Sequence, residues 1–78
     1  MRLLGNIAHP KLNISVFKSS EKIIVKFEAG PLEQSYKFLE NELIYSVDSV
    51  EKLLTEEVYK KVFEVFDKMY ENYKEIHI

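Results

Sequence analysis

The first half of the chain alternates between apolar and polar residues with the two-residue period of β-strands. Turn-forming segments interrupt the alternation, most clearly at Gly30-Pro31, where proline lacks an N–H group and glycine tolerates a positive φ. We therefore predict a meander in which sequential strands pair as antiparallel hairpins. The predicted strands cover residues 3–8, 12–19, 22–29 and 32–39, and residues 43–47 form either a fifth strand or an extended connection.

The last third of the chain has the period of an amphipathic helix, which we predict over residues 55–76. Thr55 followed by acidic residues is a helix start signal, and Asp48 or Ser49 can cap a shorter turn over residues 50–54. The apolar stripe of the long helix is wide enough to need more cover than a small sheet provides. Its central line is Tyr59, Val62, Phe66, Met69, Tyr73 and Ile76, flanked by Val58, Phe63, Val65 and Tyr70.

These patterns predict an α+β fold: a three- to five-stranded antiparallel meander with one long C-terminal helix packed on one face. The 78 residues allow a single domain over 1–78. A slip of one residue in the strand register would exchange Val25 for Ile24 in the core. The predicted core is Leu12, Ile14, Val16, Ile23, Val25, Phe27, Tyr36 and Phe38 from the strands, with Val58, Val62, Phe66 and Met69 from the helix.

Composition and charge narrow the classes of partner. The net charge is −2, with 11 basic and 13 acidic residues interspersed, whereas nucleic-acid binders usually carry a basic patch. Lys18, Lys22 and Lys26 form a weak cluster, but Glu21 and Glu28 lie among them, which favours a solvated hairpin face. The chain has no cysteine for disulfides or thiolate metal sites. It also has no long apolar run and no signal-peptide pattern, so we expect a cytoplasmic protein without membrane association.

The residues that could carry chemistry lack the partners that chemistry requires. His9 precedes a proline and His77 lies next to the C-terminus, and neither has a second ligand or base at a useful spacing. Glu40 and Glu42 form an acidic pair in an expected loop, where solubility explains them. The serines lack a nucleophile motif, and there is no glycine-rich phosphate loop. We therefore predict no enzymatic activity, no catalytic residue, no cofactor and no metal.

The tyrosines of the helix suggest association, because tyrosine combines an apolar ring with a polar hydroxyl and is enriched at interfaces. Either they line the edge of the core, or they belong to an interface. We predict a protein-interaction module that binds itself, as a homodimer, or another protein, through the helix or an uncovered strand edge. The alternative is a nucleic-acid-associated regulatory domain. The predicted interface residues are Tyr59, Phe66, Tyr70, Tyr73 and Ile76.

Three segments carry a resemblance: Ile7-Ala8-His9-Pro10, residues 25–28 (VKFE) and residues 33–38 (EQSYKF) ahead of the acidic helix start. In these segments the chain resembles a group of short, uncharacterised bacterial single-domain proteins built as an antiparallel sheet followed by one long helix. The resemblance covers most of the chain and implies the same fold. It implies no activity and brings no functional residue.

Overall fold

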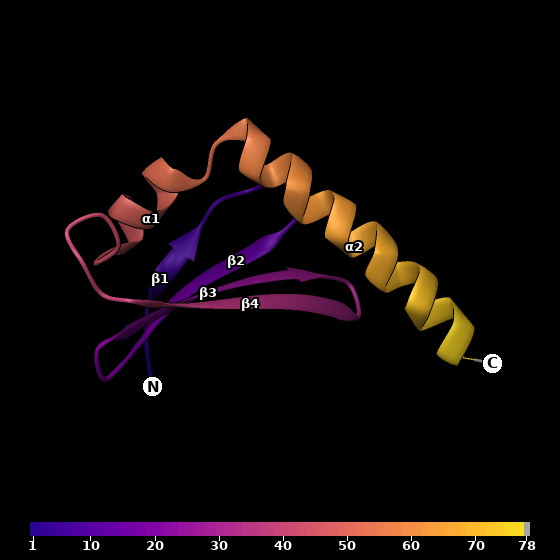
Figure 1. Cartoon of the computed structure of the whole chain (residues 1–78), viewed down its shortest axis with the longest axis horizontal. Coiled ribbons are helices and arrows are strands. Elements are labelled where there is room, and N and C mark those ends of the chain that lie inside the picture. Colours follow the sequence, from indigo (N-terminus) through magenta and orange to yellow (C-terminus); the bar gives the residue numbers. More distant parts are fainter. Residues whose placement is uncertain (78) are drawn as a thin grey trace.

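The computed structural model describes residues 1–77, which form a four-stranded antiparallel sheet followed by two helices (Figure 1). The predicted α+β class is confirmed, with the strands in the order β1-β2-β3-β4. The elements are β1 (Arg2–Ile7), β2 (Asn13–Ser19), β3 (Lys22–Ala29), β4 (Leu32–Leu39), α1 (Val47–Leu53) and α2 (Glu56–Ile76).

Two-residue turns connect β2 to β3 and β3 to β4 and set the register of the sheet. The first residue of each turn has a positive φ: 56° at Ser20 and 59° at Gly30. Glycine takes this conformation readily, whereas serine does so at a cost. The resulting register puts Val25 between Val16 on β2 and Tyr36 on β4.

One face of the sheet carries the core. Ile14, Val16, Ile23, Val25 and Phe27 are buried on this face, as predicted. Ile24 is also buried, but it points to the opposite face and lies outside the core cluster. The predicted register of β3 is therefore correct. The helices complete the cluster with Val50 from α1 and with Val62 and Phe66 from α2.

The segment between β4 and α1 is not a fifth strand. The side chain of Asn41 accepts hydrogen bonds from the N–H groups of Leu43 (2.8 Å) and Ile44 (3.1 Å), which folds residues 41–44 into a turn. Such a local side-chain bond competes with an extended conformation. The possible strand over residues 43–47 was therefore wrong: residues 42–46 form bends and α1 begins at Val47.

The cap of α1 also differs from the prediction. Ser46, rather than Asp48 or Ser49, is the N-cap residue, and its side chain accepts a hydrogen bond from the N–H group of Ser49. In return Ser49 Oγ accepts one from the N–H group of Ser46 at 3.0 Å. A serine serves here in the place where a capping box more often has glutamate or glutamine. Thr55 caps α2 as expected, through a bond from Val58 N to its Oγ1 at 3.3 Å.

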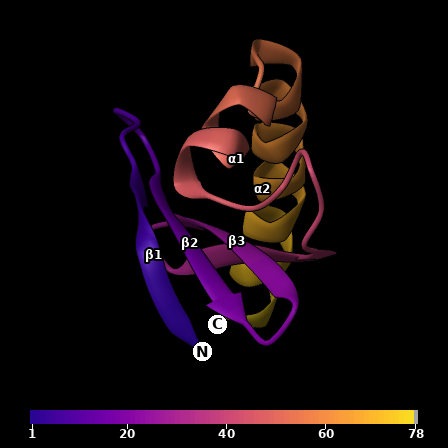
Figure 2. The same cartoon turned by 90° about the vertical axis from the view of Figure 1, so that its left-hand side faces the viewer.

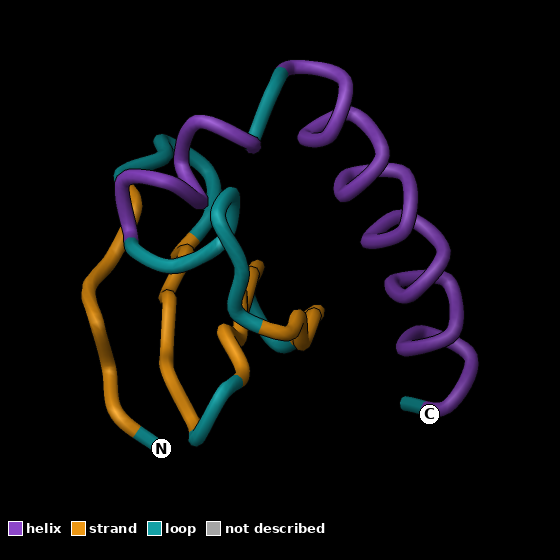
Figure 3. The backbone as a smooth tube through the Cα atoms, turned by 60° about the vertical axis from the view of Figure 1, so that its left-hand side comes forward, coloured by secondary structure: helices purple, strands orange, loops and turns teal. Residues whose placement is uncertain are grey.

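Both helices lie over the same face of the sheet, but at different sides of it (Figure 2). The backbone of α1 lies closest to β1, whereas that of α2 lies closest to β4. Figure 3 shows α2 on the side of the sheet opposite β1. Its last turns continue past the end of the sheet (Figure 1), and Ile76 is 81% exposed there.

Candidate binding groove

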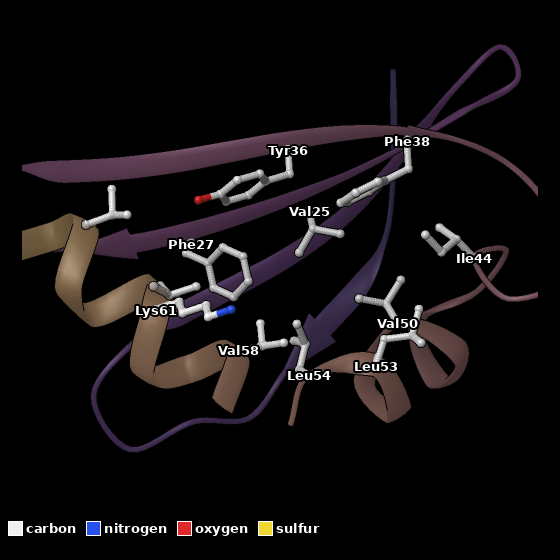
Figure 4. A pocket seen from close by; sticks show the side chains of 12 residues that line it. Val25, Phe27, Tyr36, Phe38, Ile44, Val50, Leu53, Leu54, Val58 and Lys61 are labelled. Carbon is white, nitrogen blue, oxygen red and sulfur yellow. The ribbon is translucent and has the colours of Figure 1, made fainter. Parts of the chain in front are cut away.

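A groove with a volume of ≈ 380 Å³ separates the β3–β4 part of the sheet from the two helices. Figure 4 shows the side chains of both walls converging on this space. Its size and apolar lining are typical of a binding site. The sheet contributes Val25, Phe27, Tyr36 and Phe38, and the opposite wall consists of Ile44, Val50, Leu53, Leu54, Val58, Lys61, Val62 and Val65.

Tyr36 and Phe38 are the exposed aromatic residues of this groove, and they correct the predicted core. Both point toward the helix-covered face, yet each is 39% exposed. The reason is the divergence of the helices, because α1 covers the β1 side and α2 contacts β4 without lying along it. The inward face of β4 therefore lacks a lid over its second half.

Gln34 fixes α2 to β4 at one end of the groove. This buried side chain donates from Nε2 to the carbonyl oxygen of Val62 at 2.9 Å, and its Oε1 accepts from the hydroxyl of Tyr36 at 2.5 Å. Both polar ends of the amide are thus satisfied, as a buried amide requires. The bond to Val62 holds the helix at this point, and the bond to Tyr36 orients an aromatic ring of the groove.

The outer edge of β4 is a second feature of the same region. Within residues 1–77, β4 pairs with β3 along one edge, and the other edge of β4 has no neighbouring strand. The N–H group of Glu40 donates to the carbonyl oxygen of Glu21 at 2.8 Å, which fixes the phase of the ladder. Because hydrogen bonding alternates along an antiparallel pair, the backbone groups of Glu33, Ser35, Lys37 and Leu39 point outward. Unpaired groups of this kind can accept another strand.

The structure does not gather the predicted interface residues on one surface. Phe66 is buried in the core, and the ring of Tyr59 lies 4.7 Å from that of His9, in the loop between β1 and β2. Tyr70 and Tyr73 stack with ring centroids 6.3 Å apart on the projecting part of α2, which also carries Ile76. The interface assignment itself stays a prediction.

The candidate chemical residues have ordinary structural surroundings. His9 Nδ1 accepts a hydrogen bond from the N–H group of Lys11 at 3.1 Å, and Glu40 pairs with Lys18 at 3.0 Å. Burial raises the pKa of the Tyr59 hydroxyl, and the charge of Glu51 raises it further. No cluster of three or more histidine or acidic side chains within residues 1–77 could hold a metal ion. The same residues contain no helix with the length and hydropathy needed to cross a membrane.

Sequence reasoning missed the groove, although it singled out some of its residues. The alternation placed Tyr36 and Phe38 on the correct face but could not show that the helices diverge above them. Comparison of the chain with protein-family models, curated proteins and solved structures finds no match in any of the three. The resemblance to short bacterial domains therefore stays a prediction.

Proposed function

We propose that this domain is a non-enzymatic protein-interaction module that associates with itself through the groove and the open edge of β4. The observation that carries the proposal is the exposure of Tyr36 and Phe38 on a strand with one unpaired edge. Exposed aromatic side chains beside unsatisfied backbone groups offer a partner both apolar contact and main-chain hydrogen bonds.

The geometry favours the sheet edge over the helix as the contact surface. A helix–helix seam along α2 would need Val62 and Phe66, but these residues are already buried in the core of the protomer. The outward backbone groups of β4 have no such competing role. Tyr70 and Ile76 remain exposed on α2.

The ion pairs of the sheet give no support to the alternative of nucleic-acid binding. Lys18 pairs with Glu40 at 3.0 Å, and Lys26 pairs with Glu33 at 3.9 Å. A carboxylate beside each of these lysines lowers the positive potential that a phosphate backbone would need. We therefore do not propose that function.

Light scattering across micromolar to millimolar concentration tests the proposal. The unmodified protein should exceed the 9.2 kDa mass of one chain as concentration rises. Phe38→Asp places a charge in the exposed apolar surface and should keep the protein monomeric. Leu43→Asp is the matched control, since Leu43 is 68% exposed but does not line the groove. If the unmodified protein also stays monomeric over the whole concentration range, the proposal is contradicted.

A further inference from the structure

The open edge of β4 carries a pattern that complements itself. We infer that the partner is a second copy of this chain, whose β4 pairs antiparallel with β4 about a two-fold axis at Ser35. This inference rests on the proposed function and names its partner and register. The pairing joins the two four-stranded sheets into one continuous sheet.

Charge complementarity selects this register. Glu33 and Lys37 lie two positions on either side of Ser35, and all three have outward backbone groups. When Ser35 pairs with its copy, Glu33 lies opposite Lys37 of the second chain, and the symmetry repeats this pair. A two-fold axis centred at Glu33 or at Lys37 would instead place like charges opposite each other, which is unfavourable.

Within one chain Glu33 has a long ion pair and a like-charged neighbour, and Lys37 has no ion pair within residues 1–77. Glu33 lies directly opposite Glu28 on β3, a like-charge pair, and reaches Lys26 only at 3.9 Å. Lys37 lies opposite Ile24 and forms no ion pair within residues 1–77. A second copy supplies the missing opposite charge to each residue at once.

The groove face of β4 matches the same register. Residues equally far from Ser35 on opposite sides lie opposite each other across the two-fold axis. Phe38 therefore faces Leu32 of the second copy, and Tyr36 faces Gln34 of the second copy. Phe38 gains an apolar neighbour in this register. The axis runs perpendicular to the sheet, so both copies present their helices on the same face.

The shape of β4 suits such pairing. Its eight residues pair with β3 without a register shift, and β4 begins directly after a two-residue turn. The strand is thus long, regular and free of the bulges that protect many sheet edges. Pro31 lies before the strand, so its missing N–H group leaves the outward donors of Glu33, Ser35 and Lys37 unaffected.

A charge-exchange experiment tests the register. Glu33→Lys alone places lysine opposite Lys37 of the copy, and Lys37→Glu alone places glutamate opposite Glu33. Each variant should weaken self-association by at least about tenfold in dissociation constant, because two attractive pairs become repulsive. An equimolar mixture of the two variants should associate as a heterodimer, since every facing pair is then attractive. The double variant Glu33→Lys/Lys37→Glu should self-associate nearly as well as the unmodified protein.

Lys60→Glu, on the solvent-exposed side of α2, is the control for a change in net charge and should leave association unchanged. Urea unfolding of each variant at a concentration where it is monomeric separates loss of association from loss of folding. Rescue by mixing cannot arise from a purely structural defect. Association that Phe38→Asp abolishes but that no charge variant alters would overturn the register and leave the proposed function standing. A protein that never associates overturns both.

Discussion

The two outer strands of the sheet, β1 and β4, differ in the regularity of their pairing and in how the helices cover them. β1 has a register shift between Leu3 and Gly5, and α1 packs against it so closely that a Cβ atom on Gly5 would lie 3.0 Å from Cγ2 of Val47. β4 pairs regularly along its whole length, and Tyr36 and Phe38 in its second half are each 39% exposed. A bulge and a covering helix are two common means of protecting a sheet edge. β1 has both, whereas β4 has no bulge and its contact with α2 leaves Tyr36 and Phe38 exposed.

A pair of proline substitutions on β4 should have the largest effect, and it tests which backbone groups of this strand point outward. The N–H group of Ser35 points outward, so Ser35→Pro should lower the free energy of unfolding by less than about 1 kcal/mol. The N–H group of Tyr36 points toward β3, so Tyr36→Pro should cost about 3 kcal/mol by removing a ladder bond. Urea denaturation of the monomer measures both, with Tyr36→Ala as the control for the lost ring. Ser35→Pro should also abolish association, because it removes a donor at the two-fold axis. Equal destabilisation by both prolines would show that the assigned phase of the ladder is wrong.

Gly5→Ala tests the protected edge and should have the next largest effect. The added methyl group meets Val47 at 3.0 Å, so α1 must shift, and we expect a loss of about 2 kcal/mol in the free energy of unfolding. Val47→Ala in the same chain removes the colliding atom and should recover part of that loss. Strict additivity of the two substitutions in a double-mutant cycle would contradict the close contact between β1 and α1.

The smallest expected effect concerns pH on the covered side, where Tyr59 packs beside the loop that follows β1. The folded protein raises the pKa of this hydroxyl above 10.0, so it holds the proton more tightly than the unfolded chain does. The stability linked to Tyr59 is therefore fully present below pH 10 and is lost as pH rises through the folded-state pKa. The midpoint temperature of thermal unfolding should fall less steeply above that pH for the Tyr59→Phe variant than for the unmodified protein. Identical pH profiles would place the titration elsewhere.

Local patterns in the sequence were enough to predict the elements. The ranges of β3 and β4 agree with the alternation residue by residue, and α2 begins after the predicted Thr55 cap. These features depend on neighbouring residues: side-chain alternation, turn chemistry and the first turn of a helix. The prediction of the α1 cap failed because Ser46 and Ser49 bond to each other, whereas Asp48 or Ser49 was expected to be the cap residue.

The groove could not be predicted from the periodicity of the sequence. Alternation assigns Tyr36 and Phe38 to a face, but their exposure depends on where α2 crosses that face. The bond from Gln34 to Val62, which joins residues 28 positions apart, and the burial of Val62 and Phe66 hold α2 in place. A polar residue in a strand does not reveal such an arrangement in a single sequence.

The meander order of the sheet has a further consequence for how the chain folds. Each strand pairs only with its neighbours in sequence, and two of the three connections are two-residue turns. Sheets with such local pairing close small loops and fold faster than those that join distant segments. All four strands precede both helices, so the residues of the sheet are synthesised before those of the helices that cover its core face. During that interval the apolar residues of the strands have no helix to cover them.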